Sequence, residues 1–305
     1  MARILISGAS GLIGSALVPT IQSHGHEVVR LVRGPARAAN ELQWEPMTEV
    51  PPDLVSGFDV VIHLSGESVA GRWTAEKKRR IRDSRVVSTG NLSSAVARAD
   101  KPPSIFICAS AIGYYGNRGD EILDEESSPG SGFLPEVCRE WEAAALVRGT
   151  EIRVANLRFG IVLSRHGGAL KQMLLPFRLG LGGKIGSGKQ WMSWIHIDDA
   201  VSAVVHLLRS GENIAGSALD PFAGGPVNIV SPNPVTNAEF TKILAGTLKR
   251  PAIFAVPEFA TRLAFGEFAK EGLLASARVL PKKMTEGGFQ FRYPELRAAL
   301  AQPLG

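Results

Sequence analysis

The chain has 305 residues, of which 45% are hydrophobic and 21% charged, and its 34 Lys and Arg against 29 Asp and Glu give a net charge of +5. This length allows one large α/β domain, or a main domain with a smaller lobe, without disulfide support. The charge excess suits an anionic ligand and is smaller than that of a dedicated nucleic-acid-binding protein. We therefore expect no nucleic-acid partner.

The N-terminus and the two cysteines indicate a cytoplasmic or matrix-like protein. Arg3 is followed at once by a short strand-like run, not by the longer apolar stretch of a signal peptide. No window is long enough to span a membrane. Cys108 and Cys138 lie in apolar surroundings, which favours buried free thiols in a reducing compartment. We expect no membrane partner.

Short apolar runs alternate with amphipathic stretches along the first half of the chain. The runs predict strands at residues 4–7, 28–32, 60–64, 105–109 and 154–159. The amphipathic stretches predict helices at residues 12–23, 74–99 and 133–147. Such alternation is typical of a doubly wound, Rossmann-like α/β fold, whose parallel sheet is covered on both faces.

Beyond residue 160 the pattern breaks into a glycine-rich stretch at 180–189 and several prolines. We predict a nucleotide-binding domain formed by residues 1–160 together with returning segments near 190–230. A smaller C-terminal substrate lobe would consist of residues 161–190 and 231–305. Its tail is expected to hold two helices and a closing strand.

Three glycines spaced three apart mark the junction between the first strand and the first helix. Gly8 can adopt the backbone of a tight turn, Gly11 leaves room for a pyrophosphate, and Gly14 allows the helix to pack on the sheet. The helix N-terminus would present free N–H groups to the phosphates. We therefore expect residues 8–14 to bind a dinucleotide, through these glycines and through Ser10, Leu12 and Ile13.

The end of the second predicted strand indicates which dinucleotide. Arg33 follows that strand, Arg37 is close behind it, and no acidic residue occurs before Glu41. A basic side chain there suits a 2′-phosphate, whereas an acidic one would hold a ribose 2′-hydroxyl. The sequence therefore favours NADP(H) over NAD(H), with a solvated arginine that binds no ligand as the alternative.

The densest basic stretch lies at residues 76–85. Ile81 and the two valines after it interrupt the charges at helical spacing. We interpret the stretch as the solvated face of a helix, in preference to a nucleic-acid patch.

Four segments carry a resemblance to a known superfamily. They are residues 7–14 (SGASGLIG), 59–66 (DVVIHLSG), 110–116 (SAIGYYG) and 194–199 (WIHIDD). With them the chain resembles an extended, atypical short-chain dehydrogenase/reductase. More narrowly, it is similar to the NAD-dependent epimerase/dehydratase-like branch called epimerase family proteins. Members of this branch carry residues 65–67 (SGE), 71–73 (GRW) and 83–85 (DSR) and end in a small C-terminal segment.

The resemblance implies further cofactor contacts. Leu64, Ser65 and Gly66 would pass under the adenosine and its ribose, and Glu67 and Arg85 would lie near the nicotinamide half. It also implies cofactor contacts at two residues that follow the fifth strand: Gly160 and Ile161.

The tyrosine and lysine through which related enzymes move a proton are missing. Those two residues must be four apart to share a helix face, and none of the three tyrosines has a lysine four residues later. Our alignment places Leu134 and Cys138 at these positions. A replacement phenol is available at Tyr114, beside Ser110 at the end of the fourth strand, so we predict Ser110 and Tyr114 as catalytic residues. A pocket or packing role for Tyr114 stays open, as does a cation supplied by Arg118.

The remaining signals concern the substrate. We expect it to contact Tyr115 and the second lobe at Trp191, Trp194 and His196, although the two tryptophans could equally pack beneath that lobe.

Residues 183–190 resemble a phosphate-binding P-loop but end in Gln190 and lead into a strand pattern, so we reject ATP binding. His196, Asp198 and Asp199 lack further ligands for a metal, and an Asp-capped helix from Ala200 explains them better.

The sequence supports two functions. The first is an NADP(H)-dependent oxidoreductase or epimerase-like enzyme acting on a small organic or nucleotide-linked substrate. The second is a non-catalytic sensor that binds NADPH without turnover. A homodimer is the candidate assembly in either case.

Overall fold

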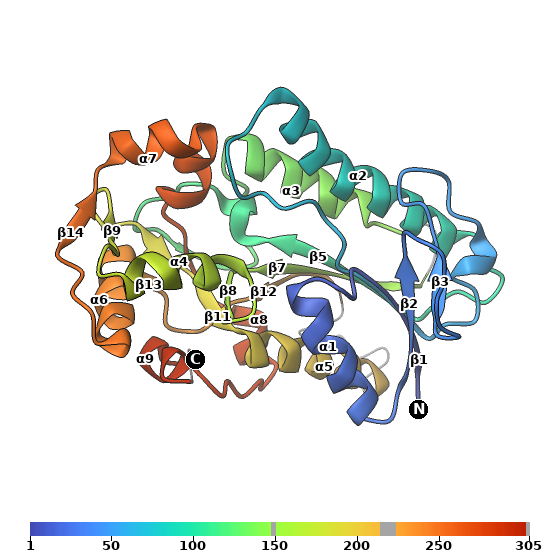
Figure 1. Ribbon diagram of the computed structural model, residues 1–305. Coiled ribbons are helices and arrows are strands. Elements are labelled where there is room, and N and C mark those ends of the chain that lie inside the picture. The colour runs from blue at the N-terminus through green and yellow to red at the C-terminus, as the bar shows by residue number, and fades with distance from the viewer. Residues whose placement is uncertain (148–150, 214–223, 303–305) are drawn as a thin grey trace.

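A computed structural model describes residues 1–147, 151–213 and 224–302. Its centre is a parallel sheet with the strand order β12-β7-β5-β4-β1-β2-β3 (Figure 1). The strands are β1 (Arg3–Ser7), β2 (Glu27–Val32), β3 (Glu41–Gln43), β4 (Val60–His63), β5 (Ile105–Ala111), β7 (Arg153–Phe159) and β12 (Gly225–Ile229). The predicted doubly wound fold is confirmed.

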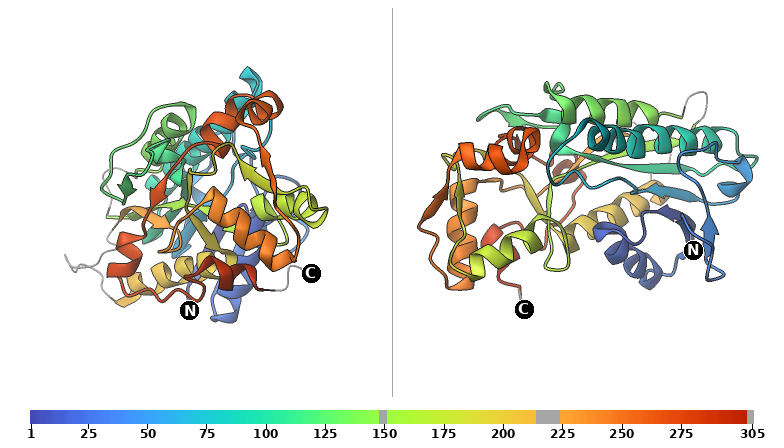
Figure 2. Two further views of the ribbon diagram at one scale, coloured as in Figure 1. Left: turned by 90° about the vertical axis from the view of Figure 1, so that its left-hand side faces the viewer. Right: turned by 45° about the horizontal axis from the view of Figure 1, so that its top comes forward.

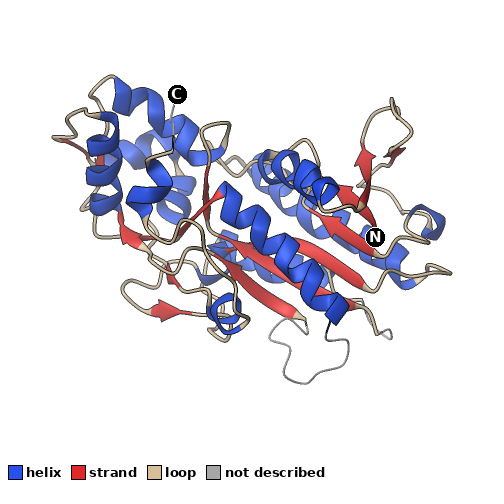
Figure 3. Ribbon diagram, turned by 90° about the horizontal axis from the view of Figure 1, so that it is seen from below, coloured by secondary structure: helices blue, strands red, loops and turns tan. Residues whose placement is uncertain are grey.

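Helices cover both faces of this sheet. Helices α2 and α3 lie side by side on one face, and α1 and α5 lie on the other (Figures 1 and 3). Their bounds are α1 (Leu12–Ser23), α2 (Ala75–Ala97), α3 (Phe133–Ala144) and α5 (Ile197–Asn213). All four residues of β4 are buried because helices cover this central strand on both sides. Such burial explains why the central strands are continuous apolar runs in the sequence.

The first predicted helix has the expected bounds, and the second is close to them. Thr74 caps α2, since its side chain accepts a hydrogen bond from the Lys77 amide at 3.1 Å. Ile81 on α2 is fully buried, as expected of the apolar side of a solvated basic helix. The prediction for α5 was less accurate, because this helix begins at Ile197, three residues before Ala200.

The rest of the chain forms a second lobe of short elements. Its helices are α4 (Gly168–Arg178), α6 (Asn237–Leu248), α7 (Glu258–Phe265), α8 (Lys282–Glu286) and α9 (Leu296–Leu300). Its two-stranded sheets pair β10 (Trp191–Met192) with β13 (Val235–Thr236), β11 (Trp194–His196) with β8 (Ile161–Leu163), β14 (Phe254–Val256) with β9 (Gly183–Ile185), and β15 (Arg278–Val279) with β6 (Ile122–Leu123). Short helical turns lie at η1 (Pro52–Leu54), η2 (Ile112–Tyr115) and η3 (Ala269–Leu273).

Of the three apolar clusters in the described residues, the two larger ones correspond to these two halves. The larger one lies around the parallel sheet and includes Met284 and Phe289 from the C-terminal tail. The smaller one lies under α4, α6 and α9 and is built around Trp194 and Phe240. The tail thus completes the core of the sheet, while the second lobe has a core of its own.

Candidate functional site

The glycine turn lies where β1 ends against β4. Gly8 has φ +75°, and a Cβ on it would lie 2.7 Å from the carbonyl carbon of Leu64. A Cβ on Gly14 would lie 2.2 Å from the Gly8 oxygen, which explains the close packing of α1 on the turn. Gly11 precedes α1 and no side chain caps this helix. Its first N–H groups are therefore left for a ligand, as a pyrophosphate-binding turn requires.

The other residues predicted for this turn surround it. Ser10 is exposed, and Leu12 and Ile13 begin α1, half-buried. The side chain of Leu12 packs against the backbone at Gly167 and Gly168, where a Cβ would lie 3.0 Å from it. Leu12 thus connects the glycine turn to the start of α4.

A buried histidine lies directly beneath the turn. The Nδ1 atom of His63 is 2.6 Å from the Ser7 hydroxyl, and its Nε2 atom is 3.3 Å from the Ser88 hydroxyl on α2. Because the Ser88 hydroxyl donates to the Ser84 carbonyl, it accepts from Nε2–H, and Nδ1 then accepts from Ser7. Burial lowers the pKa of His63 to about 4, so the ring is neutral near pH 7. The prediction of a satisfied core histidine is confirmed.

Arg33 lies just after β2 with its side chain exposed. The nearest acidic residue in sequence, Glu41, is engaged elsewhere, since its carboxylate pairs with Arg30 at 3.0 Å and accepts from the Arg37 amide at 2.8 Å. No ion pair of Arg33 is found within residues 1–147, 151–213 and 224–302. The guanidinium is thus available at the strand end where a 2′-phosphate would lie.

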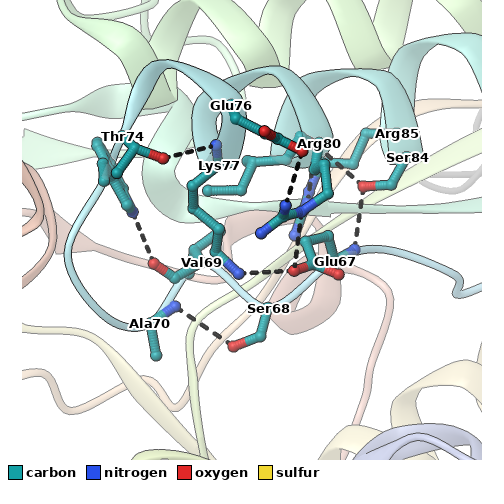
Figure 4. Close-up of polar contacts among 12 residues, drawn as sticks. Glu67, Ser68, Val69, Ala70, Thr74, Glu76, Lys77, Arg80, Ser84 and Arg85 are labelled. Atoms are coloured by element: carbon teal, nitrogen blue, oxygen red, sulfur yellow. Dashed lines mark hydrogen bonds and ion pairs between the residues drawn. The ribbon is translucent and has the colours of Figure 1, made fainter.

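The loop after β4 crosses in front of α2 (Figure 4). Leu64 and Ser65 are half-buried and Gly66 is exposed. The Glu67 amide donates to the Ser84 hydroxyl at 3.0 Å, and its carboxylate accepts from Lys77 at 2.7 Å. The hydrogen bond from Lys77 lowers the pKa of Glu67. This carboxylate is therefore an ionised anchor of the loop.

Arg85 lies behind the same loop. A Cβ on Gly66 would be 3.3 Å from its guanidinium, which lies 5.0 Å from the centre of the Trp141 ring. Its Nη1 donates to the Ile81 carbonyl at 3.0 Å. Burial lowers the pKa of Arg85, although Cys138 and Glu67 oppose that effect. A cation is thus held between the loop and α3.

A buried polar network connects the ends of β5 and β7. The Ser110 hydroxyl donates to Glu142 at 2.7 Å, and Arg158 donates two bonds of 2.8 Å to the same carboxylate. Arg158 also donates to the Tyr115 hydroxyl at 2.9 Å, and that hydroxyl lies 2.8 Å from the Asn228 side-chain oxygen. Burial raises the pKa of Tyr115 to about 12. Burial disfavours the charge on Arg158, but its bonds to Glu142 outweigh this and raise its pKa.

Arg158 was not predicted as a site residue, although it is a charged residue within an otherwise apolar strand run. The sequence left open a cation from Arg118 for Tyr114, and the contacts favour a different arginine. Arg118 forms an ion pair with Glu121, whereas Arg158 lies 3.5 Å from the centre of the Tyr114 ring. Tyr114 is half-buried in the helical turn after β5.

Leu134 and Cys138 face this turn from α3. A Cβ on Gly113 would lie 3.5 Å from the Leu134 side chain and 3.6 Å from the Cys138 sulfur. Burial raises the pKa of Cys138 to about 12, so the group is an inert thiol near neutral pH. From the α3 positions that our alignment gives to the missing tyrosine and lysine, these two side chains thus face the turn after β5.

The side chains expected to contact substrate lie at different depths. Trp191 is half-buried, and its indole donates to Asp120 at 2.8 Å beneath the guanidinium of Arg278. Trp194 is fully buried and donates to the Asn233 carbonyl at 3.0 Å. His196 packs against Tyr293 with ring centres 4.3 Å apart.

His196 and the two residues predicted beside the fifth strand are part of the same framework. The Nδ1 atom of His196 accepts from the Asp198 amide at 3.2 Å, and burial lowers the pKa of His196. A Cβ on Gly160 would lie 2.7 Å from the Ser193 carbonyl oxygen, and Ile161 is in register with Trp194. This close approach connects the end of β7 to the second lobe.

Two sequence patterns, one like a metal site and one like a P-loop, do not form such sites within the described residues. No group of three or more metal-ligating side chains is found in the part of the chain that the structure describes. Residues 183–190 begin as β9 and lead into β10, so they do not open a helix as a P-loop does.

Comparisons with known proteins agree with this architecture. The model of the "NAD dependent epimerase/dehydratase family" matches residues 4–219, and a domain of unknown function, DUF1731, matches residues 256–302. The chain is 41% identical over 302 residues to epimerase family protein Mb2239 of Mycobacterium bovis, covering 98% of this chain and 96% of that protein.

Two solved structures are also similar. A crystal structure of human epimerase family protein SDR39U1 with NADPH has a TM-score of 0.86 and 33% identity, covering 98% of both chains. A nucleoside-diphosphate sugar epimerase from Corynebacterium glutamicum has a TM-score of 0.78 and 38% identity, covering 100% of this chain and 58% of that one. The resemblance inferred from the sequence is confirmed: the chain belongs to the NAD dependent epimerase/dehydratase family and carries its C-terminal DUF1731 segment.

Proposed function

We propose that this protein binds NADP(H) across the carboxyl ends of β1, β2 and β4. The main supporting observation is the space at Gly8, which a single Cβ would fill. This space lies next to the uncapped N–H groups of α1. Arg33 would hold the 2′-phosphate, and the loop from Leu64 to Glu67 would hold the ribose side. The NADPH in the human relative and the family membership support this assignment.

Exchanging the charge at Arg33 tests the cofactor. Arg33→Glu should weaken NADPH binding roughly tenfold to a hundredfold, because a charge-assisted contact is replaced by repulsion, while NADH binding changes little. Fluorescence titration measures both affinities. Arg79→Glu, an exposed arginine on α2, is the matched control. Equal losses for NADPH and NADH would refute the assignment.

We further propose that the protein is an oxidoreductase or epimerase-like enzyme acting on a small organic or nucleotide-linked substrate. Hydride transfer is the chemistry that NADP(H) supplies when bound. The substrate would lie between the turn that carries Ser110 and Tyr114 and the second lobe at Trp191 and His196. Trp194 and Tyr115 would support the pocket from its buried side. Both cysteines are buried free thiols, which supports a cytoplasmic location.

Within this pocket Tyr114 is the better candidate for moving a proton. Tyr115 is fully buried, and Arg158 and Asn228 engage its hydroxyl. The Tyr114 hydroxyl has no hydrogen-bond partner across the described ranges, and the Arg158 guanidinium lies over the Tyr114 ring. Ser110 is committed to Glu142, so it would position substrate once that bond opens.

The second candidate function is an NADPH sensor. Leu134 and Cys138, which face the turn after β5 from α3, favour the sensor, because neither side chain relays protons. Incubating the protein with NADPH and a panel of aldehydes, ketones and sugar nucleotides, while absorbance is followed, separates the two functions. Turnover that Tyr114→Phe abolishes supports the enzyme and its phenol. Turnover unchanged by Tyr114→Phe removes this residue, and tight NADPH binding without turnover favours the sensor.

A further inference from the structure

Two segments of the second lobe hold the whole positive excess of the chain. Residues 167–190 and 240–257 contain no Asp or Glu, so the rest of the protein is slightly acidic. Their basic residues are all exposed: Lys171, Arg178, Lys184, Lys189, Lys242, Lys249 and Arg250. Although far apart in sequence, the segments are neighbours in space, because β9 pairs with β14 and α4 lies against α6.

The same end of the molecule carries large apolar side chains in contact with solvent. Of the thirteen large hydrophobic residues exposed in the described chain, nine belong here. They are Leu175, Leu179, Leu181, Ile253, Phe254, Val256, Phe259, Leu263 and Phe265. The end-on view in Figure 2 shows α4, α6, β14 and α7, which carry most of them, on one side of the protein. We call these nine residues and the seven basic ones the basic apolar face.

A groove on this face combines both properties. It lies between α6 and β14, with a volume of about 330 Å³. Lys184, Lys242 and Arg250 line it together with Ile253 and Phe254, and no acidic residue does. Nearby carboxylates are engaged locally, since Glu258 forms an ion pair with Arg262. The groove therefore matches a ligand with an anionic group attached to an apolar body.

We propose that the basic apolar face binds the surface of an anionic phospholipid bilayer. A lipid phosphate would occupy the groove at Lys184, Lys242 and Arg250, and the exposed Leu and Phe side chains would enter the boundary between headgroups and acyl chains. Within the described residues no helix is long and apolar enough to cross a membrane, so the contact is peripheral. The proposal departs from the expectation of no membrane partner, which rested on the lack of a membrane-spanning window in the sequence.

The chemistry of the face favours a bilayer over other anionic or apolar partners. A nucleic acid would match the charge but would leave the exposed leucines and phenylalanines without apolar contacts, since such interfaces are polar. A second copy of the chain would match the apolar residues but would bring like charges together. Only a surface that is both anionic and apolar satisfies both halves of the face.

Vesicle sedimentation tests the proposal with the full chain. Vesicles of phosphatidylcholine alone are compared with vesicles that also contain phosphatidylglycerol, at low and high salt. The protein should sediment only with the anionic vesicles, and less at high salt. The triple variant Lys184→Gln, Lys242→Gln, Arg250→Gln should lower the partition coefficient on the order of a hundredfold, at roughly fivefold per charge. The matched control neutralises three exposed residues elsewhere, Arg79→Gln, Lys101→Gln and Arg139→Gln.

A second variant tests the apolar half of the face. Leu179→Ser with Phe259→Ser removes two side chains that are 64% and 74% exposed, so the fold should persist and unfold at an unchanged temperature. It should weaken binding at high salt as well as at low salt. Equal sedimentation with both vesicle types, or equal losses in the triple variant and its control, would overturn the proposal. Binding of duplex DNA through the same three residues without vesicle binding would also overturn it, in favour of a nucleic-acid surface.

Discussion

Gly14 shows what one missing methyl group does for the cofactor cradle. A Cβ there would meet the Gly8 oxygen at 2.2 Å and the Ala9 Cα at 2.8 Å, and backbone atoms cannot swing aside. We expect Gly14→Ala to lower the free energy of unfolding by roughly 1 to 3 kcal/mol and to weaken NADPH binding.

Gly90 is the matched control for this substitution. It lies inside α2 with nothing within 4 Å of the position that a Cβ would occupy, so Gly90→Ala should stabilise the protein by up to about 1 kcal/mol. Urea unfolding and NADPH titration of both variants make the comparison. Similar losses in the two variants would mean that the close approach at Gly14 has no energetic importance.

His63 makes stability depend on pH. Its pKa is lowered from 6.5 to about 4 by burial, so below pH 6.5 the unfolded chain takes up a proton that the folded chain does not. Stability therefore falls as the pH drops, by about 2 kcal/mol between pH 7 and pH 5 from this group. His63→Asn should remove that part of the slope in denaturant titrations at the two pH values. A slope identical to that of the parent protein would contradict the neutral buried ring.

At the scale of elements, the Glu142 and Arg158 pair joins α3 to β7. Both side chains are largely buried, with exposures of 12% and 3%, so each charge depends on the other. Glu142→Gln should cost about 3 to 5 kcal/mol of unfolding free energy, because it leaves Arg158 charged and unpaired. Glu142→Leu with Arg158→Met should cost less than Glu142→Gln, as measured by urea unfolding. A larger loss in the double variant would show that the charges stabilise the protein beyond compensating one another.

The elements of the first half were predictable from the sequence for a physical reason. Strands buried on both faces must be continuous apolar runs, and a dinucleotide turn needs glycines at fixed spacing. The second lobe gave weaker signals, because β9, β10 and β14 have only two or three residues each and no period can be detected over so few. The start of α5 was misjudged because Asp199 does not act as its cap.

The candidate site was predictable only where its contacts are local. The glycine turn is one continuous segment, whereas Arg158 reaches Tyr115 across 43 residues and Tyr115 reaches Asn228 across 113. Such contacts depend on the strand order of the sheet, which a single sequence does not contain. The basic apolar face escaped notice likewise, since a net charge of +5 hides two cationic segments about fifty residues apart.

At the scale of the molecule, Asp199 ties the C-terminal tail to the sheet half. Its carboxylate accepts from the amides of Arg292 and Tyr293 at 2.8 and 2.9 Å. Asp199→Ala should cost about 2 to 4 kcal/mol, because a buried donor at Tyr293 and a partly buried one at Arg292 lose their acceptor. Asp198→Ala, whose side chain is 49% exposed, should cost less than about 1 kcal/mol.

Calorimetry of both variants should show a single unfolding transition at shifted temperatures. The reason is that Met284 and Phe289 from the tail lie in the core of the parallel sheet. Two resolved transitions in the parent protein would contradict this coupling.

The same arrangement bears on how such genes evolve. The tail supplies part of the core around the sheet. A recombination event that exchanged the tail for an unrelated sequence would therefore expose apolar core residues of the nucleotide half. We therefore expect the two matched segments to be inherited as one piece, and natural fusions in this lineage to add modules outside them.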